Sequence, residues 1–172
     1  AKRFLTRFEA VDTAGFPEQE QLNQSLMVRN LRRQVDNARF KEWEMPVTQI
    51  SGLHLEVAQF PALLTFTTAK DYADLTARYR KIPTAFDQTI ALMRKGMAEG
   101  LMPPRFLLEK VVAQADGLAK QAPESSPFAE PLKHFPKEIT GPEQTRLSGA
   151  MLAAIRESVP PAYVRFTTYA RD

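Results

Sequence analysis

The sequence contains no cysteine, which excludes disulfides, zinc–thiolate sites and thiol nucleophiles. It has no apolar run approaching the roughly 18 residues of a membrane-spanning helix, so we expect no transmembrane segment. The excess of positive charge is small: 23 basic and 20 acidic residues, interspersed along the chain, give a net charge of +3. A nucleic-acid-binding face usually carries a stronger basic cluster, and we predict no nucleic-acid partner.

What is present fits one folded domain. A chain of 172 residues can bury roughly two thirds of the surface that its unfolded form exposes, which allows a sizeable core. Hydrophobic residues make up 44% and charged residues 25%, as in an ordinary soluble globular protein. We therefore predict a single helical domain over residues 1–172, with a weak break in the proline-rich stretch 121–141.

The longest helical periodicity lies between Asp71 and Arg105. Apolar residues recur there every three or four positions on both sides of Pro83. Pro83 fixes φ and donates no N–H, so it predicts the first turn of a second helix, reached through a hairpin or a sharp kink. Thr68 and Asp71 have the spacing of a capped helix start. The apolar positions of the two stripes are Tyr72, Leu75, Tyr79, Ile82, Phe86, Ile90, Met93 and Met97.

Helix breakers end this region at Gly96, Gly100, Pro103 and Pro104. The two glycines follow a helix, not a strand, and no Gly-Lys-Ser/Thr is present, so they do not form a phosphate loop. A glycine here either lets two segments approach closely or supplies the left-handed conformation at a helix end.

The remaining chain predicts further helices and no strands. Residues 40–67 show no helical period, although they are too apolar for a flexible linker, and they predict a long irregular covering loop. No stretch shows the alternation of a β-strand next to turn signals. The predicted fold is all-α, a multi-helix array with a long irregular covering loop. Apolar periodicity predicts the other helices over residues 4–11, 18–39, 107–118 and 147–159.

Residues that could carry chemistry are sparse. His54 and His134 lie far apart in the sequence, and neither belongs to an H-E-x-x-H or similar metal pattern. No G-x-S-x-G elbow is present either. Lone histidines and acids near helix starts are usually structural, so we predict no catalytic residue and no metal ligand in this chain.

Several segments together resemble a known family. The pairs Asp71-Tyr72, Arg78-Tyr79 and Ile82-Pro83, followed by Arg94-Lys95-Gly96, Gly100 and Pro103-Pro104, give an order of aromatics and breakers more specific than any single residue. With Gln49–Val57, Ser126–Leu132 and Pro161–Phe166, this order resembles the amino-terminal half of the bacterial domain-of-unknown-function 885 family. The resemblance covers nearly all of the chain.

The resemblance implies a larger, mostly helical zinc metallopeptidase-like protein, periplasmic or an exported lipoprotein. Its zinc ligands and general base would come from a later H-E-x-x-H helix, and no position here matches them. The resemblance therefore implies that residues 1–172 are an amino-terminal region, inactive alone, which shapes the substrate cleft and supports a catalytic half. Zinc and a peptide substrate are expected only in the full-length protein.

Four residues are candidates for contact with a substrate or an interface. Gly52 and His54 lie in an apolar segment without a regular period and are the first candidates. Arg78 and Tyr79 are the second pair of candidates. For the isolated chain, a homodimer through exposed apolar faces is expected. A self-contained helical protein-interaction module is the alternative, and it would be monomeric with no large apolar patch.

Overall fold

The computed structural model describes residues 1–171, which form α-helices and short 3-10 helices without a β-strand. The prediction of an all-α array is confirmed. The chain divides into two compact units, Ala1–Trp43 and Glu44–Asp172. The sequence instead predicted one domain with a weak break at 121–141, and this stretch lies inside the second unit.

The first unit is a pair of helices joined by a loop, residues 10–17. The amide of Gln24 donates to the main-chain oxygen of Phe8 at 2.8 Å and links the two helices. Only Val28 and Leu31 are buried hydrophobic residues in this unit. The hairpin therefore has a very small core of its own. Its elements are α1 (Lys2–Glu9), α2 (Glu18–Asn37) and the 3-10 helix η1 (Ala38–Phe40).

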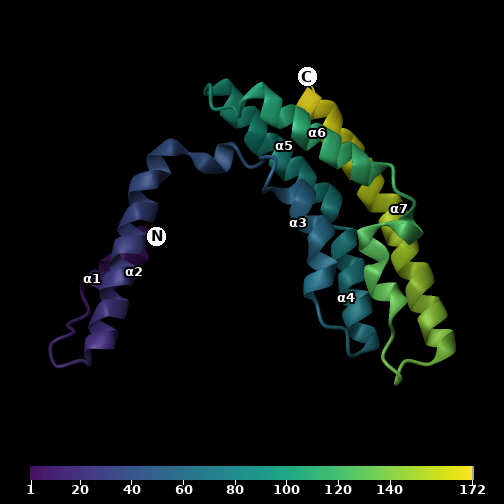
Figure 1. Ribbon diagram of the computed structural model, residues 1–172, viewed down its shortest axis with the longest axis horizontal. Helices are drawn as coiled ribbons and strands as arrows, with labels where there is room; N and C mark the ends of the chain where they lie inside the picture. The colour runs from purple at the N-terminus through teal and green to yellow at the C-terminus, as the bar shows by residue number, and fades with distance from the viewer. Residues whose placement is uncertain (172) are drawn as a thin grey trace. The chain divides into compact units, whose positions relative to one another are not determined.

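The second unit is arranged around its last helix, α7. Helices α4, α5 and α6 all pack along α7, as Figure 1 shows. Pro160 and Pro161 remove two helical N–H donors from its interior, yet α7 continues because Val159 and Tyr163 on either side are buried in the core. The helices are α3 (Leu53–Gln59), α4 (Ala69–Tyr79), α5 (Ile82–Ala98), α6 (Arg105–Ala119) and α7 (Gly141–Arg171).

Pro83 lies in the first turn of α5, as predicted. Helix α4 ends at Tyr79, and α5 begins three residues later, at Ile82. Both helices pack against the same partner, α7, one after the other along its length (Figure 1). Of the two predicted arrangements, the structure therefore has the kink and not the hairpin.

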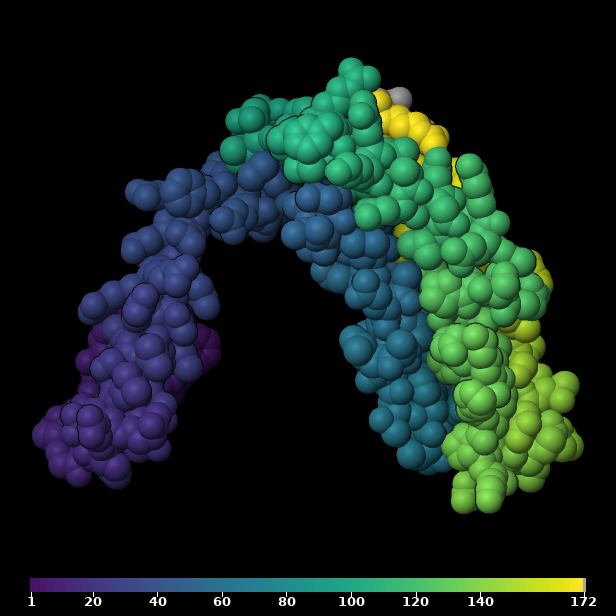
Figure 2. Space-filling model, viewed as in Figure 1, coloured from purple at the N-terminus to yellow at the C-terminus, as the bar shows by residue number. Residues whose placement is uncertain are grey.

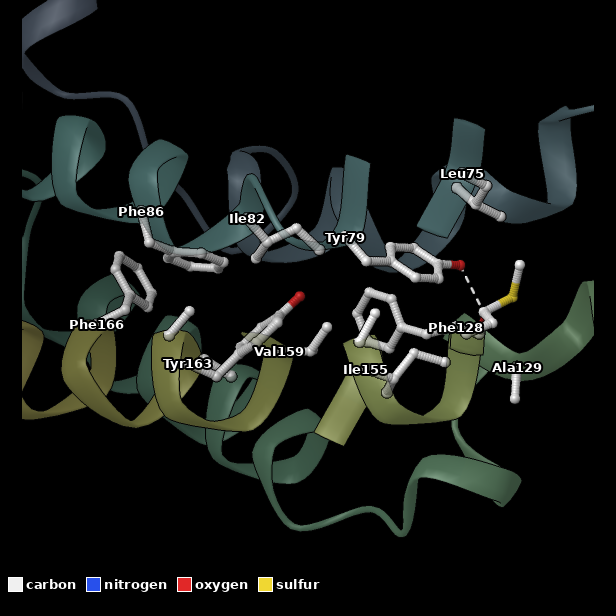
Figure 3. Close-up of a cluster of buried hydrophobic side chains, with 14 of the residues drawn as sticks. Leu75, Tyr79, Ile82, Phe86, Phe128, Ala129, Ile155, Val159, Tyr163 and Phe166 are labelled. Atoms are coloured by element: carbon white, nitrogen blue, oxygen red, sulfur yellow. Dashed lines mark hydrogen bonds between the residues drawn. The ribbon is translucent and has the colours of Figure 1, made fainter. Parts of the chain in front are cut away.

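Aromatic residues fill the layer between α4–α5 and α7. Figure 3 shows Tyr79 and Phe86 on one side, Tyr163 and Phe166 on the other, and Phe128 inserted between them. Ring centroids of Phe86 and Tyr163 lie 4.8 Å apart in a tilted arrangement, which suits the quadrupoles of aromatic rings. The space-filling view of Figure 2 shows the segments of this unit in close contact on the face that it displays.

Residues 40–67 differ from the prediction of a long irregular loop. Leu53–Gln59 form α3, and short 3-10 helices lie on both sides of it. A seven-residue helix contains too few turns to produce a visible period, which is why the sequence pattern missed it. Residues 45–52 and 64–68 lie outside the helices. The short helices are η2 (Glu42–Glu44), η3 (Phe60–Leu63), η4 (Pro123–Ser125) and η5 (Pro127–Lys133).

No helix within residues 1–171 has both the length and the apolar character needed to cross a lipid bilayer.

Candidate functional site

His54 lies in the first turn of α3 and is completely buried. Its Nε2 atom is 3.2 Å from Oε1 of Gln114, whose amide nitrogen donates to the main-chain oxygen of Gln49 at 3.0 Å. The Gln114 oxygen is thus an acceptor, so the hydrogen of neutral His54 is on Nε2. Burial is the main cause that lowers the pKa of His54. The ring also stacks on Phe166, at 5.8 Å between centroids.

Gly52 is the N-cap of α3, with a φ of 126° that side-chain-bearing residues rarely adopt. A Cβ atom there would lie 3.0 Å from the main-chain oxygen of Pro46 and 3.1 Å from Val47. Gly52 therefore lets the start of α3 pack directly on the preceding segment. Its role in the structure is one of close packing.

Arg78 and Tyr79 are neighbours in sequence but point to different surroundings. The guanidinium of Arg78 is exposed and lies 5.3 Å from the ring centroid of Phe60. Tyr79 is buried, and its hydroxyl donates to the main-chain oxygen of Phe128 at 2.7 Å (Figure 3). Burial raises the pKa of Tyr79. The structure does not bring Arg78 into the buried cluster of His54, so these candidates do not form one site.

The residues predicted to be structural have clear partners. Asp71 accepts hydrogen bonds from the main-chain N–H groups of Thr67 and Thr68, at 2.9 and 2.7 Å. These contacts lower the pKa of Asp71 to about 2. The hydroxyl of Tyr72 donates to the main-chain oxygen of His134 at 3.0 Å. Both contacts fix the ends of segments that pack on α4.

The second unit carries an apolar cavity of about 230 Å³ beside the last turn of α7, which we name the methionine pocket. Four of the six methionines of the chain line it. None of the four candidate contact residues does. The wall consists of Glu44, Met45, Pro46, Val47, Met93, Met97, Leu101, Met102, Pro103, Leu108, Tyr169 and Ala170.

Two glycines shape this pocket. A Cβ atom on Gly96 would lie 2.3 Å from the main-chain oxygen of Glu44, so only glycine lets residues 44–47 pack on α5. Gly100 has a φ of 75° and turns the chain back, so that Leu101 N donates to Gly96 O at 2.8 Å. Close approach and the left-handed conformation, the two predicted alternatives, thus occur at different glycines.

A buried carboxylate in the wall of the methionine pocket, that of Glu44, pairs with an exposed lysine. The Glu44 side chain is 0% exposed, and its Oε1 is 2.7 Å from Nζ of Lys95, which is 58% exposed. The hydrogen bond to Glu44 raises the pKa of Lys95. Because loss of Lys95 would leave the buried Glu44 carboxylate without a compensating charge, this pair holds residue 44 against α5.

A second, more open cavity adjoins the pocket and shares Met102, Pro103, Leu108 and Ala170 with it. Its volume is about 510 Å³, and its other lining residues include Arg105, Glu109 and Arg171. Arg105 pairs with Glu109 at 3.1 Å, and its side chain is 94% exposed. The pocket therefore opens from an apolar interior toward a rim with two arginines.

Zinc, which the family resemblance implies, does not fit the residues described. Within residues 1–171, no group of three or more His, Cys, Asp or Glu side chains could hold a metal ion. His54 binds Gln114 through Nε2 and packs on Phe166, and His134 is exposed on another segment.

Sequence reasoning did not identify the methionine pocket. Met93 and Met97 were assigned only to an apolar stripe, and Met45 and Met102 to no site. One local signal could have indicated it: Met97 and Met102 lie on either side of the helix-breaking Gly100. Even so, the contribution of Tyr169 depends on a contact between segments far apart in the sequence.

The fold and the pocket define an all-α protein whose second unit is built on one long helix and opens at an apolar cavity. The model of a family described as bacterial protein of unknown function (DUF885) matches residues 1–172, and the chain belongs to this family. No curated protein and no solved structure matches it.

Proposed function

We propose that residues 1–172 form a non-catalytic helical region of a zinc metallopeptidase-like protein. In this proposal the region shapes the substrate cleft and supports a catalytic half that lies outside this sequence. The peptidase character comes from the family resemblance. The zinc ligands would all be supplied by the other half, since the described residues offer no group that could hold the metal.

The supporting observation is the apolar surface of the first unit. This hairpin buries only Val28 and Leu31, while many of its large hydrophobic side chains are exposed. Most proteins expose large hydrophobic side chains one at a time, whereas this unit exposes many of them. So many exposed side chains favour a surface that another folded part of the protein covers. The exposed side chains are Phe4, Val11, Phe16, Leu22, Leu26, Met27, Phe40 and Trp43.

The test is a comparison between this chain and a longer protein that includes the catalytic half. We expect the longer protein to hydrolyse peptides and to lose this activity when a chelator removes zinc. The 172-residue protein should bind no stoichiometric zinc and hydrolyse nothing. Stoichiometric zinc on the short chain, or hydrolysis by it that one of its own substitutions abolishes, would refute the proposal.

A self-contained protein-interaction module remains the alternative, and the closed aromatic core of the second unit favours it. Such a module would be monomeric and bind little of a dye that reports exposed apolar surface. A supporting region should instead dimerise or bind the dye, mainly through residues 1–43. Size-exclusion chromatography and dye titration separate the two candidates. For a supporting region, Leu26→Lys should reduce dimerisation and dye binding, because it removes an exposed apolar side chain from residues 1–43. Lys110→Leu, the opposite change on α6, is the control and should not reduce either.

A further inference from the structure

The volume of the methionine pocket matches a single side chain. A cavity of roughly 150 Å³ suffices to hold benzene, whereas pockets for drug-sized ligands usually exceed about 300 Å³. At about 230 Å³, this pocket lies between the two. The pocket by itself can therefore receive one aromatic or long aliphatic group, and the adjoining cavity can hold what is attached to it.

The methionines make the wall adaptable. Met97 and Met102 are 51% and 54% exposed, and Met93 is half-buried, so three flexible thioethers surround the opening. Among the described residues, the buried core of the same unit contains one methionine, Met151, beside branched, aromatic and alanine side chains, and the half-buried Met93 packs against it. Methionine is common where a binding surface must adjust to partners of different shape. The exposure of Met97 and Met102 indicates a surface that a ligand covers, because neither residue packs in the core.

The surroundings of the pocket suit a peptide better than a hydrocarbon. Met45–Val47 and Leu101–Pro104, on two of its walls, lie outside the helices. Three of these seven residues are prolines without an N–H, and Leu101 N already donates to Gly96 O, so the main-chain groups that a ligand could pair with are mainly carbonyl oxygens. An extended chain can pair with such groups, as in other modes of peptide recognition. A purely apolar ligand would leave them unused.

The charge at the rim favours a carboxylate on that peptide. Arg105 and Arg171 line the adjoining cavity, and α6 begins there with no acidic residue in its first turn and no side-chain cap. The positive end of the helix dipole therefore adds to the two guanidinium groups. Both arginines already have a carboxylate partner, Glu109 for Arg105 and Asp116 for Arg171. The Arg105 side chain is 94% exposed, so its pair with Glu109 is weak and exchanges readily, which makes Arg105 the guanidinium that a ligand carboxylate can reach.

We propose that the methionine pocket is a subsite for one bulky apolar side chain of a peptide, with a neighbouring carboxylate placed at Arg105. The carboxylate belongs either to an acidic side chain or to the carboxyl terminus. That this peptide is a substrate rests on the proposed function above. The binding itself does not, and it can be measured without catalysis.

The experiment is a titration of the 172-residue protein, labelled with ¹³C at the methionine methyl groups and followed by NMR. N-acetyl-Phe-Asp amide and N-acetyl-Ala-Phe acid present the two sources of carboxylate. We expect either or both to shift the signals of Met45, Met93, Met97 and Met102. Met27 in the first unit and Met151 in the core serve as internal controls and should stay unchanged. N-acetyl-Ala-Asp amide, which lacks the bulky side chain, should have no effect.

Charge and shape are then tested separately. N-acetyl-Phe-Asn amide should bind about two- to fivefold more weakly than the Asp peptide, and Arg105→Gln should remove this difference. Met97→Trp should fill the pocket and weaken binding at least about tenfold, whereas Met27→Trp should not. Absence of shifts at the pocket methionines with both Phe peptides would overturn the proposal. Equal binding of the Asp and Asn peptides would overturn an acidic side chain as the source of the carboxylate, and equal binding of N-acetyl-Ala-Phe acid and its amide would overturn the carboxyl terminus as the source. Binding without hydrolysis by the longer protein would retain the subsite and refute only the proposed function.

Discussion

The hydroxyl of Tyr163 donates a hydrogen bond of 2.6 Å to the main-chain oxygen of His54, 109 residues earlier in the chain. The bond is buried and joins the middle of α7 to the first turn of α3. It thereby positions the His54 ring, which stacks on Phe166 one turn further along α7. A single hydroxyl thus couples the central helix to the segment that precedes α4.

Tyr163→Phe is the direct test of this bond. Loss of the hydroxyl leaves a buried carbonyl without its donor, so the free energy of unfolding should fall by about 1–3 kcal/mol. Tyr169→Phe is the matched control, because Tyr169 is only half-buried and its ring contact with Arg94 does not need the hydroxyl. Urea denaturation of both variants measures the difference. Equal losses in the two variants would mean that the Tyr163 bond adds no net stability.

The buried His54 predicts acid sensitivity near neutral pH. Burial lowers its pKa below the ordinary value of 6.5, so the unfolded chain binds a proton that the folded chain does not. Stability is therefore intact above about pH 6.5 and should fall as the pH drops toward the folded pKa, with a slope of at most about 1.4 kcal/mol per pH unit.

His54→Gln should flatten this slope between pH 7.5 and 5.5, and the readout is the pH dependence of the urea midpoint and not its absolute value. His134→Gln is the control, because His134 is exposed on a different segment. A slope that persists unchanged in His54→Gln would assign the acid sensitivity to another group.

Features encoded within a few residues were the ones that sequence alone predicted. The Thr68–Asp71 spacing gave the start of α4, and Pro83 gave the start of α5, because a cap and a fixed φ act locally. The burial of His54 could not be predicted in this way. It depends on Gln114 and Tyr163, which are 60 and 109 residues away, and no local pattern reports such contacts.

The candidate site shows the same limit. The sequence identified Gly96 and Gly100 and both physical reasons for a glycine there, but not which reason applied to which residue. The choice depends on whether another segment approaches the helix. At Gly96 the main chain of Glu44 does so, whereas nothing lies within 4 Å of the Cβ position at Gly100. The methionine pocket follows from the approach of residues 44–47, so it could not be predicted either.

The Asp71 cap predicts a second, separate pH dependence in acid. Hydrogen bonds from the main-chain N–H groups of Thr67 and then Thr68 lower its pKa from 3.8 to about 2. Its contribution to stability is therefore present above pH 3.8 and is lost as the pH falls from there to about 2. Asp71→Asn should remove this loss of stability between pH 3.8 and about 2, which circular dichroism measures during an acid titration. Asp74→Asn, which removes an exposed partner of Lys70 on the same helix, should leave the loss in place.

Gly96→Ala tests how tightly residues 44–47 pack on α5. The added methyl group would lie 2.3 Å from Glu44 O and 2.9 Å from Leu101 O, and both are main-chain atoms that cannot rotate away. Overpacking of this kind typically costs about 1–3 kcal/mol, and here it should also displace the wall of the methionine pocket. Gly149→Ala on α7 is the opposite case, since its Cβ position is open, and it should stabilise the protein by roughly 0.5–1 kcal/mol. Urea denaturation gives both values, and the methionine methyl spectrum shows whether the pocket has changed. If Gly96→Ala were as stable as Gly149→Ala with unaltered methyl signals, residues 44–47 could not lie against α5 as described.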